Sequence, residues 1–382
     1  MRCNHVQRKR RAVWHSAALA ALLWLGLSPG GVGDPAPAEE LAPKSESVRK
    51  RTAAYVFDRA GLTLSDADAT HIDQLNYSFA LLENGAVSGK HWKSIDVFRS
   101  YVKKHPHILP VLSIGGWGAD GFSQAAATPE GRARLVESTL ALMNQHGFLG
   151  VDIDWEYPGS SAAGIAASTD DRKNYTLLLS ELRTGLNELT AADGKQRLLA
   201  IALGADPSLI KNIDCAAIGG IVDQVNLMSY DLHTPRIASH HTPLFPTGDR
   251  YPLSADHAVR AYAAAGIPRS KIMLGSAFYG RVYQLKAANG EPLFAAATNS
   301  GAKTVTYRSI ITNSAWKHGF DEQAKAAYAT NGRSFLTYDS AESIRHKGAY
   351  AVQSGLMGLM CWEYGGDTSG ELLRAMRQGL DK

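Results

Sequence analysis

Short apolar segments alternate with longer amphipathic segments along residues 51–382. The short segments are rich in Val, Ile, Leu and aromatic residues, which is typical of buried strands. Eight strands are predicted, at residues 53–57, 73–80, 108–114, 150–156, 198–203, 222–230, 272–279 and 356–362. Between most of them, segments such as 130–146 and 172–189 have apolar residues every three or four positions, which predicts helices.

Eight strand–helix units predict an α/β fold, a closed (β/α)8 barrel of the TIM type that forms one domain. An open doubly wound sheet is the alternative, but eight units exceed the usual size of such a sheet. No Gly-rich phosphate-binding sequence follows any predicted strand. The repeat is interrupted by residues 282–336, before the last helix begins at Ser340. There, a β-like stretch at 303–310 with aromatic residues and glycines predicts a small α+β insertion between strand 7 and helix 7, which forms one wall of a cleft.

The first 38 residues have the composition of a secretory signal peptide. Basic residues at the start precede an apolar run at 17–27, and small residues and prolines follow it. A membrane anchor is the alternative, although the run is shorter than the ~20 residues of a spanning helix. We therefore expect cleavage of residues 1–38, a secreted or periplasmic protein free of the membrane, and a solvated linker at 39–50 before the catalytic barrel of 51–382.

Removal of this leader changes the net charge. The whole chain has 40 basic and 36 acidic residues, a formal charge of +4. Residues 1–38 contain five basic residues and one acidic residue, Asp34, so 35 residues of each sign remain without them. A nucleic-acid-binding protein concentrates Lys and Arg on its folded surface. We therefore expect no nucleic-acid partner, and we expect a monomer.

Cysteine and histidine positions do not indicate a metal or redox site. Cys3 belongs to the leader, and Cys215 and Cys361 lie in apolar segments without a C-x-x-C pair. These two residues could form one disulfide, but we expect two buried free thiols, because nothing in the sequence brings them together. The one adjacent histidine pair, His240 and His241, lies in a Pro- and Thr-rich loop. We expect no metal and no cofactor.

The strongest chemical signal is the segment 147–159, GFLGVDIDWEYPG. Asp152, Asp154 and Glu156 occupy alternate positions of an otherwise apolar strand, so all three side chains project from one face. In a barrel strand that face is the interior, near the C-terminal end where active sites of this architecture form. The alternative is a polar strand edge with solvated acids, but the apolar neighbours predict a covered central strand.

Three acids in series on one strand repel one another. Side chains at i and i+2 lie about 6.5 Å apart, and at an effective dielectric constant near 20 two such charges repel by roughly 2–3 kcal/mol. Repulsion of this size corresponds to about two pKa units, enough to hold one carboxyl group protonated near pH 6. Glu156 is nearest the mouth of the barrel and is the expected general acid.

This segment resembles the motif D-G-x-D-x-D-x-E of the family 18 glycoside hydrolases, the chitinases and their relatives. Asp152, Asp154 and Glu156 match its last three acids. The resemblance covers nearly all of residues 51–382 and includes SIGGW at 113–117, MSYD at 228–231, FYGR at 278–281 and Trp362. Leu149 stands where the family has its first Asp. We expect this departure, at the buried start of the strand, to alter packing and charge tuning more than chemistry.

The resemblance implies a chitinase that cleaves β-1,4-linked N-acetylglucosamine polymers by retaining, substrate-assisted hydrolysis. The acetamido carbonyl oxygen attacks its own anomeric carbon while Glu156 protonates the leaving oxygen, and Glu156 later activates a water. Asp154 would bond the acetamido N–H, with Asp152 sharing a proton behind it. Tyr230 would donate a hydrogen bond to the acetamido carbonyl group.

Further residues are assigned to substrate and support by the same resemblance. Trp362 would form the floor of the subsite for the distorted sugar, and Trp117 would stack on the leaving-group side. Tyr55 and Ser113 would hydrogen-bond Asp152 on its inner side. Other residues expected to contact substrate are Met228, Tyr157, Asp231, Tyr279 and Arg281.

Structural alternatives exist for several of these residues. Tyr230 with Asp231 could be a buried tyrosine with a capping acid, and Arg281 could pair with an acid at the barrel rim. Two other functions remain open: an endo-β-N-acetylglucosaminidase acting on glycan or cell-wall substrates, and a catalytically silent chitin-binding lectin. The Tyr–Asp pair and the insertion count against the first, and the presence of Glu156 and Asp154 counts against the second.

Overall fold

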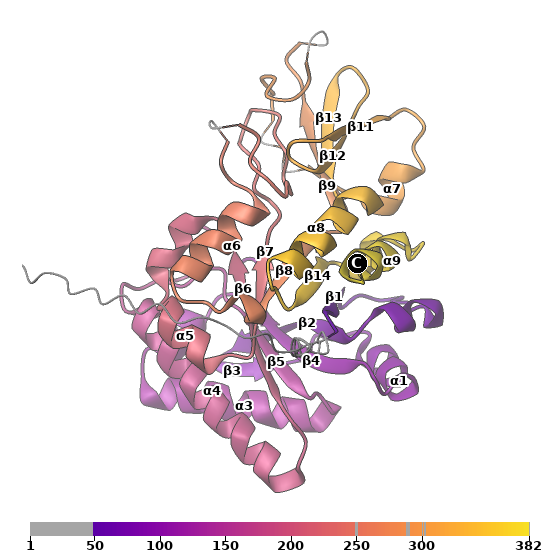
Figure 1. Ribbon diagram of the computed structural model, residues 1–382. Helices are drawn as coiled ribbons and strands as arrows, with labels where there is room; N and C mark the ends of the chain where they lie inside the picture. The colour runs from indigo at the N-terminus through magenta and orange to yellow at the C-terminus, as the bar shows by residue number, and fades with distance from the viewer. Residues whose placement is uncertain (1–48, 249–250, 288–290, 300, 302, 382) are drawn as a thin grey trace, which may run out of the picture. The chain divides into compact units, whose positions relative to one another are not determined.

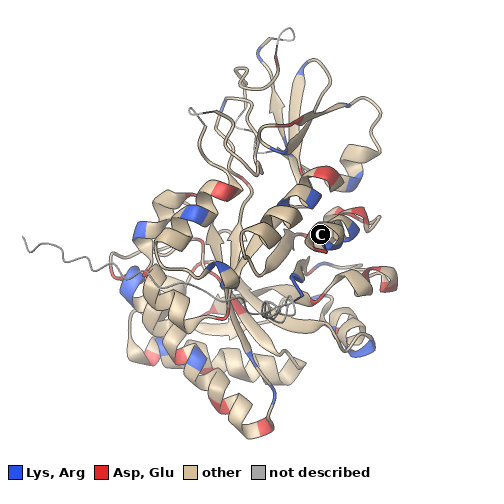
Figure 2. Cartoon of the chain, viewed as in Figure 1, with Lys and Arg blue, Asp and Glu red and all other residues tan. Residues whose placement is uncertain are grey.

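The computed structural model describes residues 49–248, 251–287, 291–299, 301 and 303–381. The expected signal peptide and most of the expected linker lie outside these residues. Within them, no helix combines the length and the apolar character that crossing a membrane requires. Figure 2 shows Lys and Arg interspersed with Asp and Glu over the helices of the visible face.

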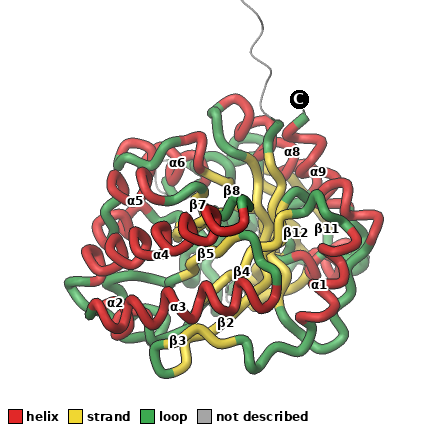
Figure 3. Tube along the Cα trace, turned by 90° about the horizontal axis from the view of Figure 1, so that it is seen from below, coloured by secondary structure: helices red, strands yellow, loops and turns green. Residues whose placement is uncertain are grey.

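Eight parallel strands form a closed barrel, with helices around it (Figure 3). In the order in which they neighbour one another, the strands are β2 (Gln74–Glu83), β4 (Leu109–Gly115), β5 (Gly150–Asp154), β6 (Leu198–Gly204), β7 (Gln224–Met228), β8 (Ile272–Ala277), β14 (Gly358–Trp362) and β1 (Arg51–Phe57). β1 also pairs with β2, which closes the barrel. The predicted TIM barrel is therefore confirmed, and the open sheet is excluded.

The outer layer contains helices from every part of the described chain (Figure 1). They are α1 (Ile95–Lys104), α2 (Phe122–Ala126), α3 (Pro129–His146), α4 (Asp171–Asp193), α5 (Cys215–Ile221), α6 (Ala255–Ala264), α8 (Ala341–Gln353) and α9 (Glu371–Leu380). Local sequence explains their ends. The Thr128 side chain accepts a hydrogen bond from Gly131 N at the start of α3, and α3 ends at Gly147, which has a φ of 78°.

Three predicted strands end earlier than expected. β5 ends at Asp154, β7 at Met228 and β8 at Ala277. Glu156, Tyr230 and the residues around them therefore lie just beyond the C-terminal ends of the strands. The prediction was wrong at these ends because the chain leaves the barrel ladder there, and Glu156, Tyr230 and Tyr279 line a cleft instead.

A second, antiparallel sheet follows the seventh barrel strand (Figure 1, orange to yellow). Its strands, in spatial order, are β10 (Lys303–Thr306), β9 (Tyr279–Gln284), β13 (Ser334–Tyr338), β12 (Ala326–Thr330) and β11 (Lys317–Asp321), and it also carries the short helix α7 (Tyr307–Ile311). Tyr283 and Phe335 are the large side chains of its separate apolar core. The sheet begins at Tyr279, with one residue between it and β8, whereas the insertion was predicted to begin at residue 282.

Two layers of side chains fill the barrel region. Between strands and helices lies the main apolar core, to which β5 contributes Val151 and Ile153. The barrel interior has a mixed content: the apolar residues Ala53, Tyr55, Ala202, Met228, Met273 and Met360, and buried polar residues that include Asp152 and Asn226. Cys215 and Cys361 are both buried and both free, as expected. The alternation of strand residues thus separates an apolar outer face from an inner face that can carry chemistry.

Candidate active site

The acidic strand β5 places its carboxylates along the inner face of the barrel. Asp152 is fully buried and Asp154 is 4% exposed, while Glu156 lies two residues beyond the strand and is partly exposed. Asp154 and Glu156 line the same cleft, and Asp152 lies below them. The predicted alternation therefore aims the first two acids inward, and the third reaches the cleft from the loop.

Three side chains hydrogen-bond Asp152. Tyr55 Oη donates to Oδ2 at 2.8 Å, Ser113 Oγ donates to Oδ2 at 2.7 Å, and Asn226 Nδ2 donates to Oδ1 at 3.0 Å. Burial raises the pKa of Asp152, while these hydrogen bonds oppose the rise. Tyr55 and Ser113 thus occupy the positions expected of them.

Sequence reasoning missed Asn226. Asp152 pairs in register with Ala200 on β6, and this small residue leaves room for Asn226 of β7 to reach across. Gln224 Nε2 donates to Asn226 Oδ1 at 2.8 Å, which orients the amide so that its N–H points at Asp152. The available signal was the alternation of β7, which puts Asn226 and Met228 on the same face.

Asp154 and Glu156 are both destabilised in their charged forms. Burial raises the pKa of Asp154 well above its ordinary value, and the charges of Glu156 and Asp152 raise it further. Asp154 Oδ1 is buried and has no hydrogen-bond partner among the described residues. Burial also raises the pKa of Glu156 to about 7, with a smaller contribution from Asp231. Desolvation therefore raises these two pKa values more than the repulsion between neighbouring acids does, whereas the sequence predicted repulsion as the cause.

The glycines of SIGGW are required by close packing. Gly115 has a φ of 120°, and a Cβ there would lie 2.1 Å from the Asp154 carbonyl oxygen. Gly116 has a φ of 94°, and a Cβ there would lie 2.7 Å from the ring of Phe79. Only glycine fits such contacts. The turn that they form carries Trp117, which is 65% exposed and makes an edge contact with Tyr157 at 6.3 Å between ring centroids.

Trp362, at the end of β14, lies among three other aromatic residues. It stacks on Phe79 at 5.4 Å between centroids, and Tyr55 and Phe57 meet it at 5.7 and 6.1 Å with their rings at steep angles. Phe57 and Phe79 were not predicted as site residues. The register of β2 with β4 shifts between Ser78 and Ala80, next to Phe79, and such irregularities redirect side chains. Periodicity alone does not reveal this one.

The Tyr230–Asp231 pair lies on the turn that follows β7. Asp231 forms a two-bond ion pair with Arg281, with Nε–Oδ1 at 2.7 Å and Nη2–Oδ2 at 2.6 Å. Although burial alone would raise it, the pKa of Asp231 is held well below its ordinary value by hydrogen bonds with His241 and Arg281. Arg281 therefore pairs with an acid at the rim, as the structural alternative proposed, and it also lines the cleft. Tyr230 packs against Tyr279 at 6.1 Å between ring centroids.

These residues surround a cleft of about 930 Å³ at the C-terminal ends of the barrel strands. Among the predicted site residues, those that line it are Tyr55, Trp117, Asp154, Glu156, Tyr157, Met228, Tyr230, Asp231, Tyr279, Arg281 and Trp362. Asp152 and Ser113 lie below its floor. Unpredicted lining residues include Phe79, His233, Glu363 and residues 304–306 of β10, so the antiparallel sheet contributes to one wall.

Leu149 lies far from this cleft along its strand. It precedes β5, at the opposite end of the strand from Glu156, and it is only partly buried rather than fully buried as expected. With Arg99 and His146 it lines a separate surface cavity beside α1 and the end of α3. The substitution at this position of the motif is thus remote from the residues around Glu156.

The cleft can therefore support proton transfer to a bound molecule. Glu156, with a pKa near neutrality, can donate a proton and later accept one. The unpaired Oδ1 of Asp154 can hydrogen-bond a polar group of the ligand, and the aromatic side chains can contact its apolar faces. The described residues contain no group of three or more His, Cys, Asp or Glu side chains arranged to hold a metal ion.

Comparisons with known proteins agree on one family. The model of the glycosyl hydrolases family 18 matches residues 46–367. Chitinase A1 of Niallia circulans is 32% identical over 313 residues, which are 75% of this chain and 44% of that protein, so the chain spans less than half of that relative. An N-acetylglucosaminidase of family 18 from Paenibacillus barengoltzii has a TM-score of 0.83 and 34% identity, covering 86% of this chain and 99% of that one. A chitinase-like agglutinin from Robinia pseudoacacia has a TM-score of 0.76 and 29% identity, covering 86% and 98%.

Proposed function

We propose that this chain, which belongs to family 18 of the glycosyl hydrolases, hydrolyses β-1,4-linked N-acetylglucosamine polymers such as chitin and its oligosaccharides. The observation that carries the proposal is the pairing of Glu156 with Asp154 in the cleft. One acid has a pKa of about 7, and the other presents an unpaired, buried oxygen beside it. A sugar with a 2-acetamido group needs both features, a proton for the leaving oxygen and a partner for the amide N–H.

The first step breaks the glycosidic bond. Glu156 donates its proton to the glycosidic oxygen, and the bond from that oxygen to C1 breaks. The acetamido carbonyl oxygen forms a bond to C1 from the opposite face, so the substrate supplies the nucleophile. Asp154 accepts a hydrogen bond from the acetamido N–H and stabilises the positive charge that develops on the amide.

The second step opens the cyclic intermediate. Glu156, now a carboxylate, takes a proton from a water molecule, and the hydroxide adds to C1 while the C1–acetamido oxygen bond breaks. Two inversions at C1 give net retention of configuration. Asp154 stabilises the cationic amide only when it is itself negatively charged, so it must give up its proton. Its buried neighbour Asp152 can take or share that proton.

The walls of the cleft position the sugar for these steps. Tyr230 donates a hydrogen bond to the acetamido carbonyl oxygen, which aims it at C1. Trp362 forms the floor for this sugar, and Trp117 provides a stacking surface for the sugar on the leaving-group side. Asp231, held by Arg281, contacts the reacting sugar from the turn that follows β7.

A chitin-binding lectin is the alternative that a specific comparison favours, because one structural neighbour is named a chitinase-like agglutinin. The acids of this chain count against it, since a lectin has no use for a carboxyl group with a pKa near 7. A second alternative is an endo-β-N-acetylglucosaminidase, which would use the same chemistry on other glycans.

Hydrolysis of 4-nitrophenyl chitobioside and of chitohexaose tests the proposal. We expect release of nitrophenol by the wild type, with a β-anomeric product seen first by NMR, and loss of turnover in Glu156→Gln with oligosaccharide binding retained. Binding without turnover in the wild type would instead identify a lectin. Activity confined to glycoprotein glycans would support the endo-glycosidase assignment. The lengths of the early chitohexaose products distinguish exo from endo action.

We also propose that the protein is exported and acts as a monomer outside the cytoplasm. The signal-peptide composition of residues 1–38 supports export. The intact mass and N-terminal sequence of protein recovered from the periplasm or the medium would test cleavage. Size-exclusion chromatography with light scattering would test the monomer.

A further inference from the structure

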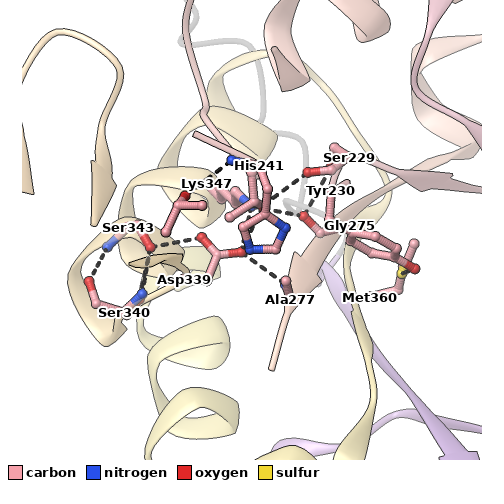
Figure 4. A network of polar contacts seen from close by, with 12 residues as sticks. Ser229, Tyr230, His241, Gly275, Ala277, Asp339, Ser340, Ser343, Lys347 and Met360 are labelled. Atoms are coloured by element: carbon pink, nitrogen blue, oxygen red, sulfur yellow. Dashed lines mark hydrogen bonds and ion pairs between the residues drawn. The ribbon is translucent and has the colours of Figure 1, made fainter. Parts of the chain in front are cut away.

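A buried ion pair lies outside the cleft, between α8 and the end of the antiparallel sheet. Lys347 Nζ is 2.7 Å from Asp339 Oδ2, and both side chains are fully buried (Figure 4). The ammonium group also donates to Thr242 Oγ1 and, at 3.2 Å, to the Gly275 carbonyl oxygen. All three of its N–H donors are therefore used. Removing two charges from water is costly, so such a pair is weak evidence for stability by itself.

Asp339 connects this pair to the end of β8. Its Oδ2 accepts a hydrogen bond from the backbone N–H of Ala277, the last residue of β8, at 2.9 Å. Its Oδ1 accepts one from Ser343 Oγ at 2.8 Å, in the first turn of α8. Arg281, the partner of Asp231, follows Ala277 by four residues. The carboxylate thus joins the end of β8, four residues before Arg281, to the first turn of α8.

Thr242 connects the same pair to the turn after β7. Its Oγ1 accepts from Lys347 and lies 3.0 Å from both the Ser229 carbonyl oxygen and Asp339 Oδ2, so its single proton is shared between them. Ser229 Oγ donates to the Gly275 carbonyl oxygen at 2.9 Å, which Lys347 also contacts. Figure 4 shows Lys347, Ser229 and Gly275 close together beside Tyr230.

The turn after β7 depends on such contacts because it lies outside the barrel ladder. β7 ends at Met228, and Asp231 has a φ of 58°, in the left-handed region that few residues other than Gly, Asn and Asp adopt. The backbone N–H of Leu232 donates to the His241 carbonyl oxygen at 2.9 Å, and His241 Nδ1 lies 3.5 Å from Asp231 Oδ1. His241 and its neighbour Thr242 therefore support the turn from below.

We propose that Lys347 and Asp339 are positioning residues. They hold the C-terminal ends of β7 and β8 together and thereby determine the positions of Tyr230 and Asp231 relative to the reacting sugar. Neither residue lines the cleft, so each acts through Thr242, Ser229 or Ala277. The expected effect on activity rests on the proposed hydrolase function. The expected effect on the position of the turn does not depend on that function.

Paired substitutions separate positioning from stability. Lys347→Met leaves the charge of Asp339 buried and unpaired, so we expect a large loss of thermal stability. The double variant Lys347→Met with Asp339→Asn carries no buried charge, so its melting temperature should recover most of that loss. We expect its kcat to stay at least tenfold below the wild type with KM changed less than threefold. The reason is that the displaced residues, Tyr230 and Asp231, contact the reacting sugar.

Thr242→Val provides a milder test in a chain that keeps the ion pair. It preserves the shape of the side chain and removes the hydroxyl group, so we expect a kcat three- to tenfold lower. The melting temperature should fall less than in Lys347→Met, because one N–H of the ammonium group loses its partner while the ion pair remains. Arg377→Met is the matched control. Arg377 pairs with Asp73 at 3.3 Å and with Asp381 at the C-terminal end of α9, remote from the cleft, and its loss should lower the melting temperature while kcat stays unchanged.

Crystal structures of Thr242→Val and of the double variant supply a readout that needs no activity. Displacement of Tyr230 and of the Asp231–Arg281 pair is expected in both. A double variant with kcat within twofold of the wild type, or a turn that keeps its place in both structures, would overturn the proposal. If the wild type hydrolyses no N-acetylglucosamine substrate, the proposed function fails, and the two crystal structures alone decide the positioning role.

Discussion

Replacement of Glu156 by Gln should stabilise the protein as it removes activity. Burial raises the pKa of this carboxyl group from 4.5 to about 7, so the native state retains its proton to a higher pH than the unfolded chain does. At 1.36 kcal/mol per pKa unit, the difference between the two values corresponds to about 3 kcal/mol. Gln preserves the size of the side chain and never becomes charged.

The sign of the pH dependence follows from proton binding. Below about pH 4.5 Glu156 is protonated in both states, and its favourable contribution to the free energy of unfolding is fully present. As the pH rises through about 7, the native carboxyl group must ionise in its buried site, and that contribution is lost. The stability of Glu156→Gln relative to the wild type should therefore increase between pH 4.5 and pH 7 and level off above it.

Urea denaturation followed by tryptophan fluorescence between pH 4.5 and pH 8.5 measures this difference. We expect the variant to gain up to about 3 kcal/mol over the range, while its kcat falls by roughly 10²–10⁴. Glu137→Gln, on the exposed face of α3, is the matched control and should follow the wild type at every pH. A constant difference between Glu156→Gln and the wild type across the range would refute the assigned burial cost.

Three further predictions concern the same site and the core. The kcat/KM profile of the wild type should decline above a pKa near 7, because Glu156 must be protonated in the free enzyme; a pH–rate series from 4 to 9 in which activity is unchanged up to pH 9 would contradict this assignment. Tyr55→Phe removes the 2.8 Å hydrogen bond to Asp152 and leaves two others, so steady-state kinetics should show kcat lower by about three- to tenfold, as expected for roughly 1 kcal/mol, and an unchanged kcat would exclude a role for this bond. Since Cys215 and Cys361 are buried and free, reductant should leave the melting temperature unchanged in differential scanning fluorimetry, and a decrease would reveal a disulfide.

The strand pattern and the acidic motif could be predicted because they depend on local alternation. Apolar runs marked all eight barrel strands, and the period of two along β5 placed Asp152 and Asp154 on the inner face. The ends of β5, β7 and β8 could not be predicted in this way. A strand ends where its neighbours stop offering hydrogen-bond partners, and those neighbours are remote in sequence.

Several site contacts also depended on distant parts of the chain. Asn226 reaches Asp152 across β6, where the register partner of Asp152 is the small residue Ala200. Phe79 faces Trp362 where the register of β2 shifts. The neighbouring sequence does not indicate the role of either residue, because that role depends on a packing partner on another strand.

By itself, the sequence determined which residues could carry the chemistry, since residue type and periodicity establish that acids alternate along a covered strand. Only the tertiary structure decided how strongly each acid resists ionisation. The pKa of Glu156 depends mainly on how much water its surroundings exclude, and that exclusion arises when eight strands and the loops above them close around one cleft. Desolvation is a property of the whole packed environment, so no short segment of the chain contains it.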